Sequence, residues 1–535
     1  MPAAPAAPDL DAAARAVELA KAVVDGCANR LAAAGPGALE AEQVVAYDLA
    51  HAAAGVAIAG AFLDYGALGD VEARMACAFA ADVTHDVAGK ILGREAAWGL
   101  EPAAAGALDA AMSFVRTYRS PEFLAGLFGE QGRRHLDADF ELVQDTFRRF
   151  AEDKIRPAAE HVHRHNTDIP EEIISGLAAM GGFGLSVPEE YGGWASGGES
   201  DYLGMVVATE ELSRGSLGIG GSLITRPEIL TRALVRGGTE EQKQHWLPKI
   251  ATAEVMVAVA VTEPDFGSDV AGLKVTATRD GDEYLINGVK TWCTFAARAD
   301  VLMLLARTDP DRGKAHRGLS LFIVPKPRGE GHGFAFTQDG GGRMEGRAID
   351  TIGYRGMHSY EVAFDNWSVP ASCLIGESGG ENRGFYYQME GFENGRLQTA
   401  ARAVGVMQAA YEAGYEYAVN RVVFGHPIAD YQLNKAKLAR MAVILQASRQ
   451  FSYRVARLMA KGEGALEASM VKAYVCRAAE WASREAMQLH GGMGYAEEFP
   501  VSRYFVDARV LSIFEGADET LALKVIARRL TERTA

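Results

Sequence analysis

Four segments of the sequence gather side chains that can hold a cofactor or move a proton. Hydroxyl groups occur at Thr262, Ser268 and Thr294, in or beside short β-branched runs whose end loops can bind a cofactor without charge. Arg421 offers paired donors that suit a pyrophosphate, and Glu515 offers a carboxylate that can accept a proton. The segments are residues 259–275 (VAVTEPDFGSDVAGLKV), 287–300 (NGVKTWCTFAARAD), 420–432 (NRVVFGHPIADYQ) and 487–529, which contains QLHGGMGY and FEGADE.

Taken alone, each of these residues also has an ordinary structural interpretation. The hydroxyls could belong to turns and strand ends, and Trp292 could lie in the core, as large apolar side chains usually do. Glu515 could be a solvated helix residue and Arg421 a surface cation. Only the joint pattern, in one order along the chain, favours a functional site.

Composition and charge exclude several other classes of protein. The net charge of −16 and the pI near 5.3 leave no basic face for nucleic acid, so nucleic-acid binding is not expected. The isolated glycines of RGSLGIGGSL do not follow a predicted strand, so a dinucleotide-binding fingerprint is rejected. Five cysteines without CxxC spacing argue against a zinc or disulfide framework, and no metal site is predicted: Cys27, Cys77, Cys293, Cys373 and Cys476.

The N-terminal region gives no sign of export or of a membrane span. An Ala/Pro tail, expected to be disordered, enters a helix without a basic residue before a long apolar run, which is unlike a signal peptide. The most apolar stretch, residues 49–68, is rich in Ala and Gly and contains His51 and Asp64, which favours a buried helix. We therefore expect a cytoplasmic protein that does not insert into membranes.

Hydropathy patterning divides the 535 residues into four parts. Residues 1–135 form an Ala-rich helical extension, and residues 136–255 form a second helical region. Residues 256–378 carry short β-branched runs bounded by turns, which is typical of strands, and residues 379–535 return to long amphipathic helices. This order predicts an α+β fold and excludes a doubly wound sheet.

The strand region contains signals for turns and loops. The run DGDEYLINGVK holds two hairpin signals, Asp280-Gly281 and Asn287-Gly288. The Gly-rich stretch RGEGHGFAFTQDGGGRMEGRAIDTIG, residues 328–353, is expected to be a long loop.

In this order and at these separations, the four segments resemble the acyl-CoA dehydrogenase family, over the 400 residues from 136 to 535. The resemblance implies that family's fold: a helical domain, a middle β-domain and a C-terminal helical bundle, here preceded by the extension. It also implies an FAD-dependent oxidoreductase that acts on the CH–CH bond between Cα and Cβ of an acyl-CoA thioester.

The resemblance assigns the FAD contacts residue by residue. Residues 259–268 would follow the flavin edge, Trp292 would pack on the flavin, and Thr294 would bond near its N5. Contacts from a neighbouring subunit would come from residues 421–432 and 488–492, where glycines allow close backbone approach. The implied cofactor-binding residues are Val259, Val261, Thr262, Gly267, Ser268, Trp292, Thr294, Arg421, Phe424, Gln432, Gln488, Gly491, Gly492, Ala517 and Glu519.

Glu515 in FEGADE matches the position of the family's general base. Some relatives that act on branched substrates carry the base on an earlier helix, but the matching position here is Gly395, which cannot serve. The resemblance implies substrate contacts at Ser268, Glu393, Arg396 and Phe514.

The sequence departs from the family pattern in four places, one of which is the stretch 328–353, longer here than in most members. The family's EGT reads EGA here, so Ala517 lacks a hydroxyl, and the run TLALKVIARR holds one extra residue. Residues 357–359 read Met-His-Ser where relatives often show Ser, Asp or Asn, then Thr.

The extension, the long loop and the run MEGRAIDTIGYRGMHSYEVAFD resemble family members that oxidise (2S)-methylsuccinyl-CoA to mesaconyl-CoA in the ethylmalonyl-CoA pathway. The tail carboxylate of that substrate needs a cation or several donors if it is buried. Arg214 matches a carboxylate-facing arginine of glutaryl-CoA relatives, although relatives with monocarboxylate substrates also carry it. Arg226, Arg355 and His358 are further candidates, each with a structural or surface role as the alternative, and Gly218, Gly220 and Gly221 could leave room for the α-methyl branch.

The resemblance also implies partners. Electron-transferring flavoprotein is the expected electron acceptor, and a homodimer is favoured over a tetramer, with the extension covering the surface where a second dimer would dock. Isovaleryl-, 2-methylbutyryl- and glutaryl-CoA remain alternative substrates. An acyl-CoA oxidase, a monooxygenase of the same fold, or a non-catalytic scaffold are the alternative functions; retention of Glu515 and of the FAD segments argues against the scaffold.

Overall fold

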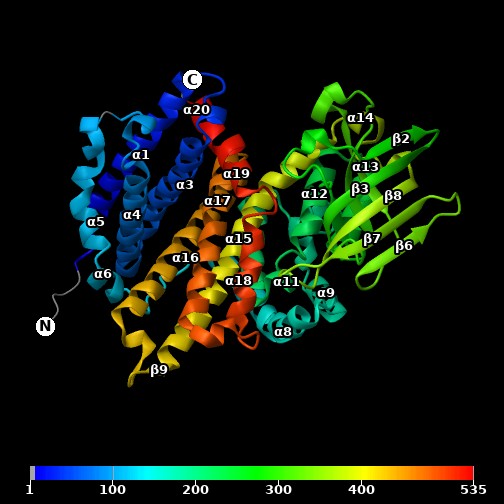
Figure 1. Ribbon diagram of the computed structural model, residues 1–535. Coiled ribbons are helices and arrows are strands. Elements are labelled where there is room, and N and C mark those ends of the chain that lie inside the picture. The colour runs from blue at the N-terminus through cyan, green and yellow to red at the C-terminus, as the bar shows by residue number, and fades with distance from the viewer. Residues whose placement is uncertain (1–5, 101, 534–535) are drawn as a thin grey trace. The chain divides into compact units, whose positions relative to one another are not determined.

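The computed structural model describes residues 6–100 and 102–533, and the side chains of these residues except 102–105, 107 and 390. Residues 1–5 of the predicted disordered tail lie outside this range. Contacts divide the chain into two compact units: unit 1 is Met1–Glu141 with Thr399–Ala535, and unit 2 is Leu142–Gln398 (Figure 1). The four predicted parts therefore associate in pairs, because the extension shares a unit with the C-terminal helices and the second helical region shares one with the strands.

Unit 1 is a bundle of helices from both ends of the chain. Its helix α3 (Gln43–Gly66) packs against α1, α4, α16 and α17. By length and composition α3 could cross a membrane, but 67% of its most apolar window is buried inside the protein, as expected for residues 49–68. The other helices are α1 (Leu10–Ala33), α2 (Ala38–Ala41), α4 (Asp70–Ile91), α5 (Met112–Tyr118), α6 (Pro121–Gly126), α15 (Gly384–Asn420) from Thr399 onward, α16 (Gln432–Met459), α17 (Ala465–Leu489), α18 (Pro500–Leu511), α19 (Asp518–Thr520) and α20 (Arg528–Glu532).

The first helix shows how local sequence sets these elements. The Asp9 carboxylate accepts a hydrogen bond from the Ala12 N–H at 2.8 Å and so caps the N-terminus of α1. Buried residues then recur every three or four positions, as in Ala13, Ala16 and Val17, which gives α1 one apolar face. All five cysteines of the chain are buried free thiols.

The helical part of unit 2 contains one irregular turn. The amphipathic helix predicted from His135 begins as α7 (Ala138–Phe150), passes through the π-helix Ala151–Ile155 and continues as α8 (Arg156–His165). Pro157 lacks an N–H and cannot join the regular hydrogen-bond ladder, which accounts for the irregular turn before it. The remaining helices are α9 (Glu171–Ala179), α10 (Glu199–Gly215), α11 (Leu217–Gly220), α12 (Thr225–Gly237), α13 (Glu240–Ala251), α14 (Glu377–Gly380) and the first part of α15.

An eight-stranded sheet forms the rest of unit 2, in the order β1-β4-β2-β3-β8-β7-β6 with β5 paired to β4. Its strand β4 (Val301–Arg307) is buried on both faces because alternate residues enter different cores. Leu302 and Leu304 pack in the core that includes α10, whereas Met303 and Leu305 pack in the core with α12 and α13. The other strands are β1 (Val257–Ala260), β2 (Thr276–Asp280), β3 (Glu283–Thr294), β5 (Leu319–Pro325), β6 (Gly333–Thr337), β7 (Arg343–Ile349) and β8 (Ser359–Pro370).

One of the two predicted hairpin turns is wrong. At Asp280-Gly281 the chain does turn, and β2 pairs antiparallel with β3. At Asn287-Gly288 the chain continues within β3, because pairing with β8 extends on both sides of this dipeptide. Gly288, with φ +126°, instead forms part of a β-bulge within β3.

The long loop predicted over residues 328–353 is also wrong in part. Its centre forms the hairpin β6–β7, and this hairpin ends the sheet beside β8. Phe334 and Met344 enter the core from the two strands, so alternating burial holds the hairpin in place despite its many glycines.

Candidate active site

Strand β1 and the loop after it carry the first group of predicted flavin contacts: Val259 in the strand, and Val261, Thr262, Gly267 and Ser268 in the loop. A buried ion pair fixes this loop. The Lys290 Nζ lies 2.9 Å from the Glu263 Oε1 and donates to the Val261 carbonyl at 2.8 Å. Glu263 also accepts the N–H groups of Lys274 at 2.7 Å and Val275 at 2.9 Å. Burial lowers the pKa of the Lys290 ammonium to about 8, against the opposing effect of the Glu263 charge.

Trp292 is turned outward by a break in the pairing of β3. The register shifts between Lys290 and Cys293, and Trp292 has φ +58° with 55% of its surface exposed. A positive φ is strained for so bulky a residue and persists only where its surroundings enforce it. The Thr291 N–H donates to the Thr262 carbonyl at 2.8 Å, so the two predicted segments are bonded to each other at the residue before the exposed Trp292.

A contact within the chain accounts for the residue type at Thr294, but none does so at Gly267. Thr294 is buried, with its Oγ1 3.0 Å from the Ser359 Oγ. Gly267 is exposed, and an added Cβ would meet only the Thr262 Cγ2, at 3.9 Å. The chain therefore supplies no steric reason for glycine at this position, and Ser268 beside it is exposed as well.

Three of the predicted substrate contacts lie on helices of unit 2. Arg214 is buried in α10, where its Nη1 lies 2.5 Å from the Glu152 Oε1 and 4.0 Å from the Glu211 Oε2. Two protein carboxylates thus already surround this guanidinium. Glu393 and Arg396 are half-buried on α15, and Gly395 between them is buried.

Glu515 lies in a loop of unit 1 that joins α18 to α19. The Asp518 N–H donates to the Ser512 carbonyl at 3.1 Å and closes the loop, and Glu515 takes φ +53° within it. The Glu515 side chain is 7% exposed, with Oε1 lying 3.0 Å from the Nη1 of the fully buried Arg402. The Thr399 hydroxyl donates to its Oε2 at 3.2 Å. Two side chains of α15 therefore orient the predicted base.

Two buried cations, Arg402 and Lys472, contact the loop that carries Glu515, and neither was predicted as a site residue from the sequence. The Arg402 guanidinium lies 5.4 Å from the centre of the Phe514 ring, and the Lys472 Nζ donates to the Gly516 carbonyl at 2.5 Å. Each is a single cation in an otherwise apolar helical run, TAARAVGVMQAA and MVKAYVC. A buried charge requires a partner, so these runs did contain a usable signal.

The residues after Glu515 explain two departures from the family pattern. Ala517 is the N-cap of α19 and offers no side-chain oxygen to it, and Glu519 is exposed. Residues Leu521–Ala527 form a π-helix, the structure that lets a helix accommodate one extra residue. The π-helix therefore accommodates the extra residue inferred in TLALKVIARR without interrupting the helix.

The third group of predicted flavin contacts projects from unit 1. Arg421 and Phe424 belong to the small hairpin β9 (Val422–Val423) and β10 (His426–Pro427), and Phe424 is 92% exposed. Gln432 and Gln488 are exposed, and open space adjoins Gly491 and Gly492. Tyr495, nearby in sequence, is 85% exposed. These residues are therefore exposed on the surface of unit 1.

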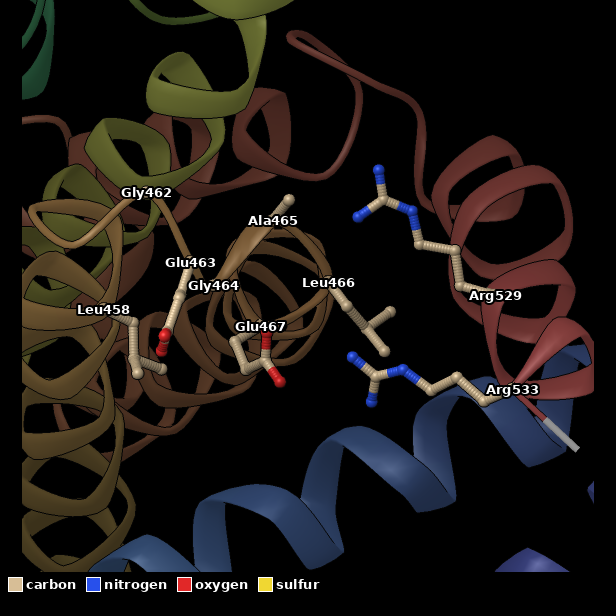
Figure 2. A pocket seen from close by; sticks show the side chains of 9 residues that line it. All are labelled: Leu458, Gly462, Glu463, Gly464, Ala465, Leu466, Glu467, Arg529 and Arg533. Atoms are coloured by element: carbon tan, nitrogen blue, oxygen red, sulfur yellow. The ribbon is translucent and has the colours of Figure 1, made fainter.

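Two further polar features fall outside the predicted site. A cavity of about 420 Å³ lies at the N-terminus of α17, and Figure 2 shows Arg529 and Arg533 directed toward it, with Glu463 and Glu467 on its other side. None of the predicted site residues lines this cavity.

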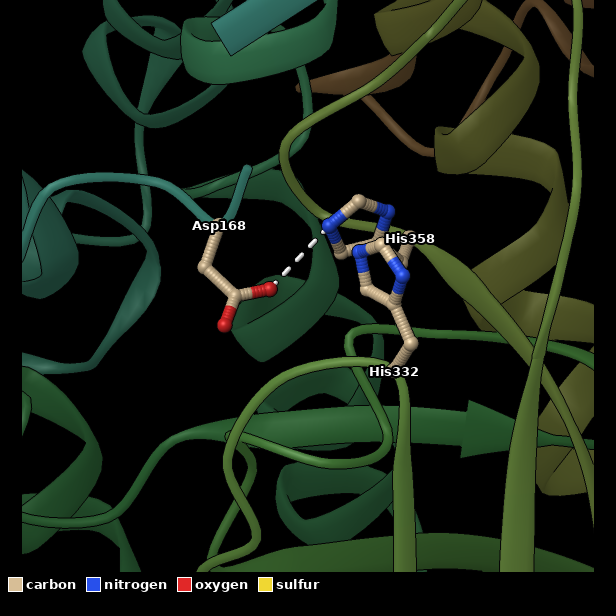
Figure 3. Close-up of side chains that lie close together, drawn as sticks. All are labelled: Asp168, His332 and His358. Atoms are coloured by element: carbon tan, nitrogen blue, oxygen red, sulfur yellow. Dashed lines mark ion pairs between the residues drawn. The ribbon is translucent and has the colours of Figure 1, made fainter. Parts of the chain in front are cut away.

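The second feature is the cluster of Asp168, His332 and His358 in unit 2, shown in Figure 3. The Asp168 Oδ1 lies 3.1 Å from the His358 Nε2, and this contact with His358 lowers the pKa of Asp168. The His332 Nε2 lies 2.8 Å from the Asn166 carbonyl, and Asp168 also accepts the Gly331 N–H at 3.1 Å. These are metal-ligand residue types, but their polar atoms already tie two loops together.

Family models cover most of the chain. The acyl-CoA dehydrogenase N-terminal domain matches residues 137–254, the middle domain residues 258–367 and the C-terminal domain residues 382–531. The chain belongs to the acyl-CoA dehydrogenase family. It is therefore an oxidoreductase that dehydrogenates acyl-CoA thioesters, in a family of flavoproteins, and the predicted α+β fold is confirmed.

One relative of known activity and two solved structures illustrate the similarity. The (2S)-methylsuccinyl-CoA dehydrogenase of Cereibacter sphaeroides is 43% identical over 406 residues, which cover 76% of this chain and 71% of the relative. A chain from a structure described as the electron transferring flavoprotein of Acidaminococcus fermentans is 29% identical with a TM-score of 0.66, covering 75% of this chain and 98% of that one. A glutaryl-CoA dehydrogenase from Mycobacterium smegmatis in complex with FADH2 is 27% identical with a TM-score of 0.64, covering 75% and 96%.

Proposed function

We propose that this enzyme oxidises (2S)-methylsuccinyl-CoA to mesaconyl-CoA with bound FAD, and passes the electrons to an electron-transferring flavoprotein. The observation that carries the substrate assignment is the buried contact between Arg402 and Glu515, which places a cation beside the base. The 43% identity to a dehydrogenase of that substrate supports the same conclusion. The likeness to a chain from an electron transferring flavoprotein structure supports the acceptor.

The residues present fit a flavin. The exposed and strained Trp292 offers an aromatic face, and the glycine at 267 has no steric cause within the chain. Trp292, Thr294 and the loop at residues 259–268 would hold the flavin ring, while Arg421 of a neighbouring subunit would hold the pyrophosphate. When bound, FAD accepts the hydride that leaves Cβ of the substrate.

Glu515 is the proposed general base. Its carboxylate takes the proton from Cα, and the electron pair of that C–H bond forms the new double bond as the β-hydrogen departs with its own pair. The acyl group thus loses one proton and one hydride. Arg402 and Thr399 hold the carboxylate in a single orientation, and the Glu515 side chain is 7% exposed.

Arg402 is the proposed partner of the substrate's tail carboxylate. In methylsuccinyl-CoA two carbon–carbon bonds separate Cα from the tail carboxyl carbon, a span of roughly 2.5 Å from standard bond lengths. A cation within 3.0 Å of the base is therefore within reach of that carboxylate. Arg402 also donates to the Thr399 hydroxyl at 3.4 Å and is fully buried, so the tail carboxylate would bind it by replacing part of its present contacts.

The other arginines and the histidine considered from the sequence are less suited to this role. Arg355 donates to the carbonyls of Thr351 and His163, at 3.1 and 2.8 Å, and His358 contacts Asp168. Arg214 pairs with Glu152, and Arg226 lies buried in the first turn of α12. An added Cβ at Gly218 would come within 2.2 Å of the Arg355 carbonyl, so backbone packing explains that glycine without a substrate methyl group.

A homodimer in the cytoplasm completes the proposal. The exposed Phe424 and the open space at Gly491 and Gly492 suit a flavin shared across a subunit interface. The extension helices α3 and α4 cover α16, which supports the idea that they occupy a surface otherwise open to a second dimer. Five buried free thiols fit a reducing compartment.

The test is kcat/KM for five thioesters with one electron acceptor: (2S)-methylsuccinyl-, isovaleryl-, 2-methylbutyryl-, glutaryl- and succinyl-CoA. We expect methylsuccinyl-CoA to exceed the uncharged branched analogues by roughly 10²-fold or more, because a site built around polar groups rejects analogues that leave them unpaired. A higher value for isovaleryl-CoA would overturn the substrate assignment and leave the reaction class intact. Faster turnover with oxygen than with electron-transferring flavoprotein would favour an oxidase.

A further inference from the structure

We infer that Tyr47 and His51, in the N-terminal extension, are positioning residues for Glu515, because they hold the carboxylate at the end of its loop. The inference rests on the proposed role of Glu515 as the base. It gives the extension a part in the reaction that is separate from any part in subunit assembly.

Both side chains contact one carboxylate oxygen of Asp518. The Tyr47 hydroxyl donates to the Asp518 Oδ2 at 2.5 Å, and the His51 Nε2 lies 3.2 Å from the same oxygen. Their rings pack edge to face with centres 4.6 Å apart, and Arg477 lies 5.9 Å from the Tyr47 ring centre. His51 and Asp518 are each 7% exposed, so this carboxylate relies on the extension for polar partners that water would otherwise supply.

Asp518 marks the point where the Glu515 loop becomes α19. Its N–H closes the loop onto the Ser512 carbonyl at 3.1 Å. The N-cap residue before it, Ala517, has no side-chain oxygen to fix the start of the helix. The contacts of Tyr47 and His51 with the Asp518 side chain fix the start of the helix instead.

The loop needs external support because its backbone is strained. Glu515 has φ +53°, a conformation that a residue with a Cβ adopts only where its surroundings enforce it. Three contacts do so: Arg402 holds the Glu515 carboxylate, Lys472 holds the Gly516 carbonyl, and the pair Tyr47 and His51 holds Asp518. Only the third comes from the extension, 471 residues from Asp518 in the case of Tyr47.

The electrostatics of Asp518 agree with this anchoring. Burial alone would raise the pKa of its carboxyl group. The bonds from His51 and Tyr47 and the charge of Arg477 instead hold the pKa below its usual value. The ionised carboxylate is therefore the form that accepts the Tyr47 hydroxyl.

The experiment uses full-length, FAD-loaded protein carrying Tyr47→Phe, His51→Leu or Asp518→Asn. Anaerobic stopped-flow mixing with methylsuccinyl-CoA gives the limiting rate of flavin bleaching and the apparent Kd of the thioester. A shifted base should lower the limiting rate by roughly tenfold, because misplacement of a reacting group by about 1 Å can cost 10²-fold. The Kd and the melting temperature should stay near those of the wild type for Tyr47→Phe, which removes one oxygen atom.

Tyr118→Phe is the matched control, since the Tyr118 hydroxyl donates to the Ala7 carbonyl at 2.7 Å, within the extension. Unchanged bleaching rates in Tyr47→Phe, His51→Leu and Asp518→Asn would overturn the inference. Equal losses in Tyr47→Phe and Tyr118→Phe would also overturn it, because they would show a general effect of weakening the extension. Glu515→Gln is measured in parallel. If it bleaches normally, the proposed base is wrong, whereas an inactive Glu515→Gln beside normal rates in Tyr47→Phe, His51→Leu and Asp518→Asn refutes only the positioning role.

Discussion

The Nη1 of Arg402 lies 3.0 Å from the Oε1 of Glu515, with the two side chains 0% and 7% exposed. A buried carboxylate and guanidinium in contact stabilise each other, but each would be costly to leave without its partner. The contact holds the carboxylate of the base in one orientation. In the proposed function, the Arg402 guanidinium beside the base is the partner of the substrate's second carboxylate.

Arg402→Gln should reduce discrimination between acidic and uncharged thioesters. The glutamine cannot supply a charge to the tail carboxylate, so kcat/KM for methylsuccinyl-CoA should fall at least roughly 10²-fold further than that for isovaleryl-CoA. Steady-state kinetics with both thioesters measures this ratio, and Arg454→Gln, at an exposed ion pair with Asp64, is the control. Equal losses for both substrates would assign Arg402 to the base alone.

Purified protein should contain FAD, one per subunit and noncovalently bound. Acid extraction followed by chromatography measures both identity and amount. Arg421→Ala should retain less FAD, because the phosphate groups would lose their paired donors. Extraction of FMN, or no flavin after reconstitution, would contradict the proposed site.

The protein should be a dimer in solution. Phe424 is 92% exposed, and its burial between subunits would remove a large apolar surface from water. Phe424→Asp should therefore weaken both association and FAD retention. Multi-angle light scattering with absorbance detection reports both; a monomeric wild type would contradict a shared flavin site, and a tetramer would contradict the masking role of the extension.

Lys290→Met should destabilise the loop that follows β1. It leaves the Glu263 carboxylate buried without its cation, at a cost of about 3–5 kcal/mol in the free energy of unfolding. The double variant with Glu263→Gln should recover part of that loss, because it removes the unpaired buried charge. Recovery should be incomplete, because the single amide oxygen can accept only one of the N–H groups of Lys274 and Val275, which now bond to different carboxylate oxygens. Urea unfolding measures all three proteins, and a single variant as stable as the wild type would refute this role.

The fold could be predicted because its signals are local and repeated. Helical spacing and β-branched runs marked the helical and strand regions, and the joint order of four segments indicated the family. The errors came from competition between local and long-range structure. Asn287-Gly288 is a strong turn signal, yet pairing with β8 on both sides made it a bulge. Residues 328–353 look like a loop by composition, but alternating core contacts form the β6–β7 hairpin.

The site could be predicted only as separate residues. Glu515 was found from its segment, but Arg402, 113 positions earlier, belongs to no motif, and its importance depends on a contact that spacing does not reveal. The contact between Tyr47 and Asp518 spans 471 positions. Such pairs are set by how the helices of unit 1 pack, which the residue types leave undetermined.

The most direct test of the account is anaerobic flavin bleaching by (2S)-methylsuccinyl-CoA in the wild type and in Glu515→Gln. The variant keeps the shape of the side chain but cannot accept a proton, so the rate should fall by more than the roughly 10²–10⁴-fold typical of acid–base groups. The wild type should bleach and form mesaconyl-CoA, while the variant should bind FAD and remain yellow. Bleaching of Glu515→Gln at nearly the wild-type rate, or a wild type that stays yellow with this substrate, would contradict the account.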